Sequence, residues 1–312
     1  MRRLMPAVAT LVFGFASVSG AQTGNADAVM AAARAALGGE ARIAAVKTFI
    51  ATGRTRQVRG ENLVPIEFEI QAELPDKYSR RDEFPAQDAG PVTAGFVGDA
   101  LVLIPRPVPP PPKPGAPAPP PGAQEAMLRG RLMSAKQDFV RLLLGMFAGS
   151  TAAFPLTYAY VGQAEAPQGK ADVIDVKGPN NFSARLFVAG DTKLPIMLSW
   201  QGGPGGPAAG PGGPGAQGAQ GAQRAQGAPG AQGAPAGAPS APIAPSAPGA
   251  PSAPRAPVEQ RLFFADYRDV DGLKLPFRLR RAVGTETTEE TTFDRYRINA
   301  RVDPRRFDTK AQ

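Results

Sequence analysis

The segment LFFADYRDVDGLKLPFRLRR, residues 262–281, decides how the folded part of this chain is built. It reads as a strand, a tight turn and a second strand. In the second strand four apolar residues alternate with Lys, Pro and Arg: Leu273, Leu275, Phe277 and Leu279. Successive side chains of a strand point to opposite faces, so this period of two predicts a sheet with one apolar face and one solvent-facing face.

The same alternation returns at residues 66–74, where apolar residues alternate with glutamate and glutamine. Two other stretches, 26–37 and 125–147, carry apolar residues at three- and four-residue spacing, which predicts one helix near the start and one in the centre. Further strand-like runs lie between and after these helices. Together the patterns predict one continuous antiparallel sheet accompanied by two helices.

Residues 1–21 are expected to be a signal peptide. Arg2 and Arg3 precede a short apolar stretch, and Ser19-Gly20-Ala21 supplies the small residues of a cleavage site. The stretch is too short to span a bilayer comfortably, and no later run reaches about 18 apolar residues. The sequence therefore predicts an exported, periplasmic protein with no transmembrane span after cleavage.

Two low-complexity stretches interrupt the folded part, a Pro-rich linker at 105–123 and an insert rich in Gly, Ala, Pro and Gln at 202–257. Part of the insert has Gly at every third place, but the register breaks at Arg224, which favours disorder over a collagen-like triple helix. Because the cost of closing a loop grows slowly with its length, the insert is expected to be an enlarged hairpin loop. One β-rich domain would then contain the remaining segments: 22–104, 124–201 and 258–312.

Composition removes several classes of function. The chain has no His and no Cys, so neither a Ser-His-Asp triad nor a zinc site built from these residues can be assembled. Its 35 Lys and Arg against 27 Asp and Glu are scattered and accompany no nucleic-acid-binding motif. We therefore predict no catalytic residue, no cofactor, no metal ligand and no nucleic-acid partner.

Carboxylates are the one catalytic resource that the composition leaves. Asp266, Asp269 and Asp271 form the densest group, and a pair of carboxylates can hydrolyse glycosides. The simpler interpretation of these residues is a charged hairpin turn, which we favour. The hydrolase hypothesis predicts that Asp266→Ala or Asp269→Ala abolishes turnover.

Apolar surface is what the chain offers instead of catalytic groups. The apolar face of the sheet and the apolar stripe of the central helix, packed together, make either an ordinary core or a cavity for an acyl chain. The residues expected to line such a cavity are Ile66, Phe68, Ile70, Phe139, Leu143, Met146, Leu273, Leu275, Phe277 and Leu279.

The order of these elements resembles the LolA/LolB-like family of periplasmic lipoprotein carriers. Residues 160–165, 186–198 and 264–276 also resemble exported bacterial proteins described as outer-membrane lipoprotein-sorting-like. The resemblance implies an α+β fold: a strongly curved antiparallel sheet, or incomplete barrel, with an N-terminal helix and a central helix packed on its concave face. No position matches the carrier's functional arginine or its membrane-insertion loop, and the two low-complexity stretches depart from the family pattern.

Two functions remain open after these considerations. The first is an exported, non-catalytic, carrier-like protein that binds a lipid or a lipoprotein acyl chain. The second is a structural or interaction protein of the cell envelope, in which the β core is solid and the low-complexity segments bind an envelope partner. The sequence identifies neither the ligand nor the partner.

Overall fold

The computed structural model describes residues 21–85, 90–106, 120–166, 169–202 and 258–309. Most of the predicted signal peptide, linker and insert lie outside the described residues. The helices are α1 (Ala21–Ala36), α2 (Glu40–Ala44) and α3 (Ala123–Phe147), followed near the C-terminus by the 3-10 turn η1 (Pro304–Phe307). The strands are β1 (Thr48–Arg59), β2 (Asn62–Glu73), β3 (Lys77–Glu83), β4 (Val92–Val97), β5 (Ala100–Ile104), β6 (Thr157–Ala166), β7 (Gly169–Gly178), β8 (Phe182–Ala189), β9 (Pro195–Gly202), β10 (Val258–Val270), β11 (Leu273–Val283) and β12 (Glu286–Ile298).

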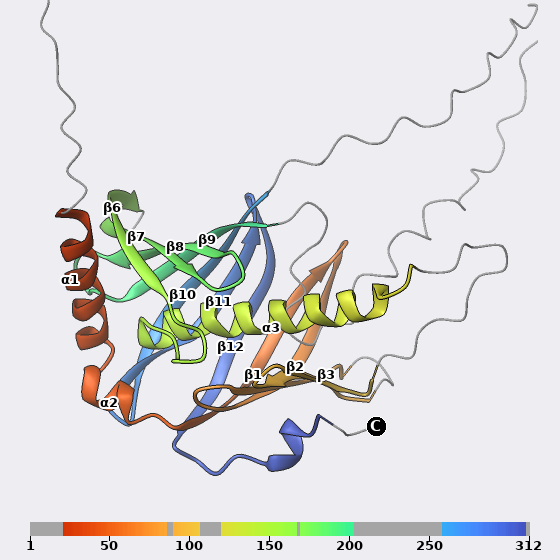
Figure 1. Ribbon diagram of the computed structural model, residues 1–312. Coiled ribbons are helices and arrows are strands. Elements are labelled where there is room, and N and C mark those ends of the chain that lie inside the picture. The colour runs from red at the N-terminus through yellow and green to blue at the C-terminus, as the bar shows by residue number, and fades with distance from the viewer. Residues whose placement is uncertain (1–20, 86–89, 107–119, 167–168, 203–257, 310–312) are drawn as a thin grey trace, which may run out of the picture.

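All the strands belong to one antiparallel sheet that curves around α3 without closing into a barrel (Figure 1). The order is β5-β4-β3-β2-β1-β12-β11-β10-β9-β8-β7-β6. The sheet thus consists of two meanders, β1–β5 and β6–β12, which meet where β1 pairs with β12. β9 and β10 are also paired, Gly202 facing Val258, as expected for strands on either side of an enlarged hairpin loop.

The alternating segments of the sequence form the concave face of the sheet. On β2, Ile66, Phe68 and Ile70 are buried, while Glu67 lies on the exposed side. β11 repeats the pattern. Because one face of β2 packs in the interior and the other faces solvent, the period of two in its sequence corresponds to burial. The α+β architecture predicted from the sequence, with α3 on the concave face of a curved open sheet, is confirmed.

Irregularities along several strands accompany the curvature. The register between β1 and β12 shifts at Thr52 and Gly53, and the register between β6 and β7 shifts between Tyr160 and Gly162. On β10, Asp266 has a φ of 56°, while the register with β11 stays the same on either side of it, with Ala265 opposite Arg278 and Tyr267 opposite Pro276. An extra residue in one strand bends it and increases its twist, which lets a wide sheet curl around a helix. The sequence did not predict these bulges.

α3 divides the interior into two hydrophobic cores. Val140 and Leu144 pack into one core with α1 and strands β7–β10, whereas Phe139 and Leu143 pack into the other with β1–β4, β11 and β12. The helix is therefore buried on every side over its C-terminal half, and not only along the single stripe expected from its sequence. In the part of the chain that the structure describes, no helix is long and apolar enough to cross a membrane.

α3 approaches the sheet closely at Gly145. A Cβ atom at this position would overlap the ring of Phe264 on β10, so only glycine allows the helix and the strand to lie this near each other. The hydroxyl of Tyr267, on the same strand, lies 2.8 Å from the carbonyl oxygens of both Gly145 and Pro195. This contact holds the C-terminal half of α3 against β9 and β10.

We expect Gly145→Ala to lower the free energy of unfolding by about 1–3 kcal/mol, because the added methyl group overfills the helix–strand contact. The matched control is Gly130→Ala in the same helix, where nothing lies within 4 Å of an added Cβ. That change should raise stability by up to about 1 kcal/mol through helix propensity alone. Urea unfolding followed by the fluorescence of Trp200 measures both, and equal effects would contradict the close contact.

Candidate functional site

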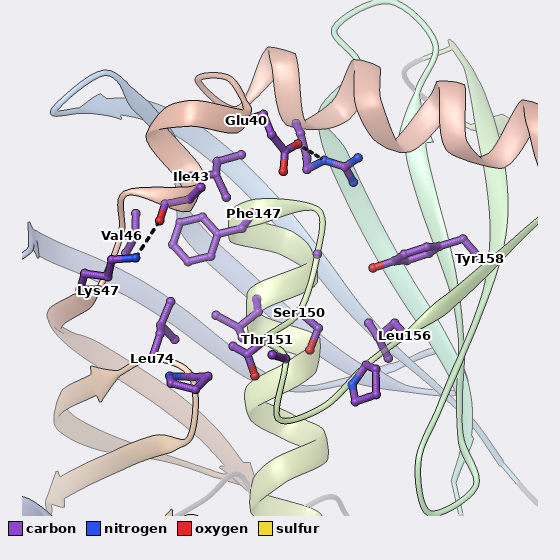
Figure 2. A pocket seen from close by; sticks show the side chains of 17 residues that line it. Glu40, Ile43, Val46, Lys47, Leu74, Phe147, Ser150, Thr151, Leu156 and Tyr158 are labelled. Carbon is purple, nitrogen blue, oxygen red and sulfur yellow. Dashed lines mark hydrogen bonds and ion pairs between the residues drawn. The ribbon is translucent and has the colours of Figure 1, made fainter.

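A cavity of about 590 Å³ lies where α3 ends. We call it the cleft. Its walls come from α1, α2, the start of β1, the turn after β2, the end of α3, residues 149–152 and the start of β6. Figure 2 shows Ile43, Val46 and Leu74 on one side and Leu156 and Tyr158 on the other, with the end of α3 between them. Segments far apart in the sequence therefore build the cleft together.

The cleft has an apolar floor. Leu143 and Phe147 reach it from the last turns of α3, and both are almost fully buried. Val46, also buried, and Leu74 border it from the β1–β2 side. The helix ends here because Ala148 adopts the left-handed conformation, with a φ of 46°, and its N–H closes the last turn on Leu144.

Polar groups are arranged around the rim of the cleft. Arg34 forms an ion pair of 2.5 Å with Glu40, and its Nη1 donates to the carbonyl oxygen of Ala148 at 3.5 Å. Lys47 Nζ donates to the carbonyl oxygen of Ala44 at 3.3 Å. Ser150 Oγ is buried and makes no hydrogen bond within the described part of the chain. The rim thus offers cationic and hydroxyl donors beside an apolar floor.

Tyr158 marks the boundary between the polar rim and the apolar wall. Burial raises the pKa of its hydroxyl to about 12, and the nearby Arg34 guanidinium lowers it in part. The ring faces the cleft (Figure 2). The phenol is therefore neutral at physiological pH and can only donate or accept a hydrogen bond.

A second, smaller cavity of about 210 Å³ adjoins the cleft about one turn earlier along the same face of α3. We call it the side pocket. Its walls include three aromatic rings, those of Phe96, Phe139 and Phe154. Pro75 and Thr151 line both the cleft and the side pocket, so the two cavities meet at these residues.

An ion pair lies at the rim of the side pocket. Lys136 Nζ on α3 is 2.6 Å from Asp99 Oδ1 in the turn between β4 and β5. The hydrogen bond from Lys136 lowers the pKa of Asp99. The Lys136 ammonium also lies 5.7 Å from the ring centroid of Phe96. The cation at this cavity is therefore paired with a carboxylate, as Arg34 is at the cleft, whereas Lys47 contacts a backbone carbonyl oxygen.

The ten residues predicted to line an apolar cavity lie along one side of the interior. Leu143 borders the cleft, and Phe139 borders the side pocket. The remaining eight lie in the interior; Leu279 is half-buried and the other seven are buried: Ile66, Phe68, Ile70, Met146, Leu273, Leu275 and Phe277. Of these, Phe68 also borders a separate cavity of about 370 Å³, and Ile70 and Leu279 border a hollow of about 40 Å³. The sequence missed most of the cleft, because its wall consists of loop and helix-end residues that have no periodic pattern.

The carboxylates considered for hydrolysis form contacts within the β10–β11 hairpin. Asp266 pairs with Arg268 at 2.5 Å, and this hydrogen bond lowers the pKa of Asp266. Asp269 Oδ1 accepts a hydrogen bond of 3.1 Å from the backbone N–H of Gly272 in the turn. Within the described residues, no group of three or more Asp and Glu side chains is placed to hold a metal ion.

A buried charged cluster between α3 and the sheet was not predicted. Asp138 pairs with Arg141 at 2.8 Å and lies 3.7 Å from Arg281, and both guanidinium groups lie over the ring of Trp200. Burial lowers the pKa of Arg141, and the Asp138 carboxylate opposes this effect. A hollow of about 40 Å³ beside the cluster is far smaller than ordinary ligand pockets. Arg141 lies off the apolar stripe of the helix, so its sequence pattern indicated a solvated position.

We expect Asp138→Asn to lower the free energy of unfolding by about 3–5 kcal/mol, because two buried arginines lose the carboxylate that they share. Asp99→Asn is the matched control, since it removes an exposed carboxylate that pairs with the same helix. That control should change stability little. Urea unfolding of both variants is the measurement, and a small effect of Asp138→Asn would contradict a structural role for the cluster.

The Tyr158 hydroxyl should make stability depend on pH in the alkaline range. Its pKa is about 12 in the folded protein against 10.0 ordinarily, so the unfolded chain loses this proton first. The stabilisation of the folded state by the protonated hydroxyl is present in full below pH 10 and is lost as pH rises towards about 12. Tyr158→Phe should reduce the alkaline loss of unfolding free energy by up to about 2 kcal/mol. An unchanged pH profile in urea unfolding would show that the phenol is not buried.

No protein-family model matches the sequence, and a search of curated protein sequences finds no significant match. Among solved structures, the chain is similar to a LolA superfamily protein from Nitrosomonas europaea, with a TM-score of 0.48 and 9% identity over 91% of this chain and 97% of that one. It is also similar to a domain described as an outer membrane lipoprotein-sorting protein from Vibrio parahaemolyticus, with a TM-score of 0.44 and 7% identity over 91% and 96% of the two chains.

A third similar structure is a DUF1329 family protein from Desulfovibrio piger, with a TM-score of 0.42 and 8% identity over 91% of this chain and 97% of that one. Two of the three names are those of the group that the sequence resembles. At identities this low, the similarity concerns the fold alone.

Proposed function

We propose that this protein is an exported, non-catalytic, carrier-like protein that binds a lipid or a lipoprotein acyl chain in the cleft. The observation that carries the proposal is the cleft itself. Its volume of about 590 Å³ falls in the range of small-molecule sites, which are concave, mainly apolar and provided with a few polar groups. Leu143 and Phe147 form a floor of this kind, and Arg34 and Lys47 stand at the rim.

The chemistry of the rim supports binding rather than turnover. A general base or a nucleophile needs a neighbour that activates it, and the chain contains no His and no Cys for that purpose. Glu40, the carboxylate of the cleft, is held by Arg34. Such a pair can orient or screen a polar head group, while the floor removes methylene groups from water.

The proposed location follows from the start of the chain. A basic n-region, a short apolar stretch and small residues before Gln22 favour export, and the periplasm is the compartment that we propose. A periplasmic carrier needs a surface that shields acyl chains in water. Burial of apolar surface contributes roughly 0.8 kcal/mol for each methylene group, which is sufficient for a single chain to bind.

A second candidate function is binding to an envelope partner without any lipid. One observation favours it: eight of the ten residues first expected to line a cavity are packed in the interior, so the centre of the curved sheet is mostly filled. This candidate predicts that the delipidated protein binds no fatty acid. The same titration therefore separates the two functions.

Binding of a dansyl-labelled fatty acid to the delipidated full-length protein tests the proposal. We expect saturable binding, and we expect Ala152→Trp to weaken it by about tenfold or more, because the indole occupies the cleft. Ala126→Trp is the matched control, since Ala126 is exposed on α3 and lines neither cavity. Absence of binding would refute the proposal, and equal weakening in both variants would place the ligand outside the cleft.

A further inference from the structure

We propose that the cleft and the side pocket form one bent channel for a single unbranched acyl chain with an anionic end. The anionic end lies beside Arg34 and Lys47, and the terminal methyl group lies in the side pocket. The side pocket then sets the chain length that the protein prefers. This inference rests on the proposed function. It adds the class of ligand, the orientation of the ligand in the channel, and the pocket that sets the preferred chain length.

The continuity of the channel rests on shared walls. Pro75 and Thr151 line both cavities, and consecutive residues of one loop divide them: Ala152 lines only the cleft, whereas Ala153 lines only the side pocket. Both alanines are exposed and carry the smallest side chain with a Cβ. The loop therefore borders the whole path without filling it.

Charge gives the channel a direction. The charged groups of the cleft are two cations, Arg34 and Lys47, and one carboxylate, Glu40, while the Tyr158 phenol is neutral. The balance reverses in the side pocket, where two carboxylates, Asp76 and Asp99, accompany Lys136. An anionic end is therefore attracted to the cleft and repelled from the side pocket.

Hydrogen-bond capacity points the same way. An ammonium group has three donors, and Lys47 Nζ uses one of them on the carbonyl oxygen of Ala44. Ser150 Oγ, buried in the wall of the cleft, makes no hydrogen bond within the described residues. A carboxylate in the cleft could accept from both groups. The side pocket instead presents the rings of Phe96 and Phe139, whose centroids are 5.7 Å apart, which suit a methyl end.

Chain length is the quantity that the side pocket should control. Each buried methylene is worth about 0.8 kcal/mol, so affinity should rise by about fourfold for each one until the channel is full. Longer chains then gain nothing further. A protein with only the cleft would reach this plateau at a shorter chain.

The experiment is competition of saturated fatty acids and of the matching fatty alcohols, both as a series of chain lengths, against the dansyl-labelled fatty acid on the full-length protein. Ala153→Trp fills the side pocket. It should lower the affinity for the longest acids by about tenfold or more and leave that for the shortest acids unchanged. Ala126→Trp, which adds the same side chain elsewhere, should leave the whole series unchanged.

The anionic end is tested in the same assay. Lys47→Gln should lower the affinity for the fatty acids by about fivefold to tenfold and leave the affinity for the fatty alcohols unchanged. Arg129→Gln is the matched control, because Arg129 is an exposed cation that lines neither cavity. Thermal unfolding of every variant verifies that each is folded.

The outcomes separate this inference from the proposed function. If the wild-type protein binds no acyl chain, the proposed function fails and the channel with it. If it binds acids of all lengths equally well with and without Ala153→Trp, acyl binding stands and the channel is refuted. If acids and alcohols bind equally in the wild type and in Lys47→Gln, the assignment of the anionic end is refuted.

Discussion

The contact between Gly145 and the ring of Phe264 determines where α3 lies inside the sheet. A larger residue would hold the helix away from β10, and the Tyr267 hydroxyl could no longer reach the carbonyl oxygen of Gly145. The helix ends one turn later, and residues 148–156 leave it from that fixed point. Both cavities are bordered by this loop, so their shape depends on a glycine that touches neither of them.

The position of α3 also explains why the interior is filled in the middle and open at one end. Between Phe139 and Phe147 the helix is buried on every side, with a core on each flank. Past Ala148 there is no helix left to fill the curve of the sheet. The cleft is therefore a helix-end cavity, whereas the alternating residues left open whether sheet and helix enclose an ordinary core or a cavity.

The elements that could be predicted from the sequence are those whose pattern is local. The alternation at 66–74 and 273–279 and the spacing at 125–147 correctly predicted two strands, the buried side of each strand, and the central helix, which is however buried on every side from Phe139 to Phe147. Two kinds of feature could not be predicted. Bulges such as that between Thr52 and Gly53 depend on the pairing partner, and the burial of Arg141 depends on Trp200, which is far away in the sequence. The cleft belongs with these features, since Arg34 and Tyr158 meet only in the folded chain.

The pairing of β1 with β12 has a consequence for how this protein is made. Phe49 lies opposite Ile298, so the first strand of the chain acquires its second neighbour only from the last strand. Contacts at such sequence separation form slowly, because most of the chain must be ordered before they can be made. During synthesis the two meanders therefore remain separate sheets with unpaired edge strands, and unpaired edge strands can pair with other chains. Until residues 286–298 have been synthesised, only the surroundings of the chain can keep the edge strands of each meander from pairing with other molecules.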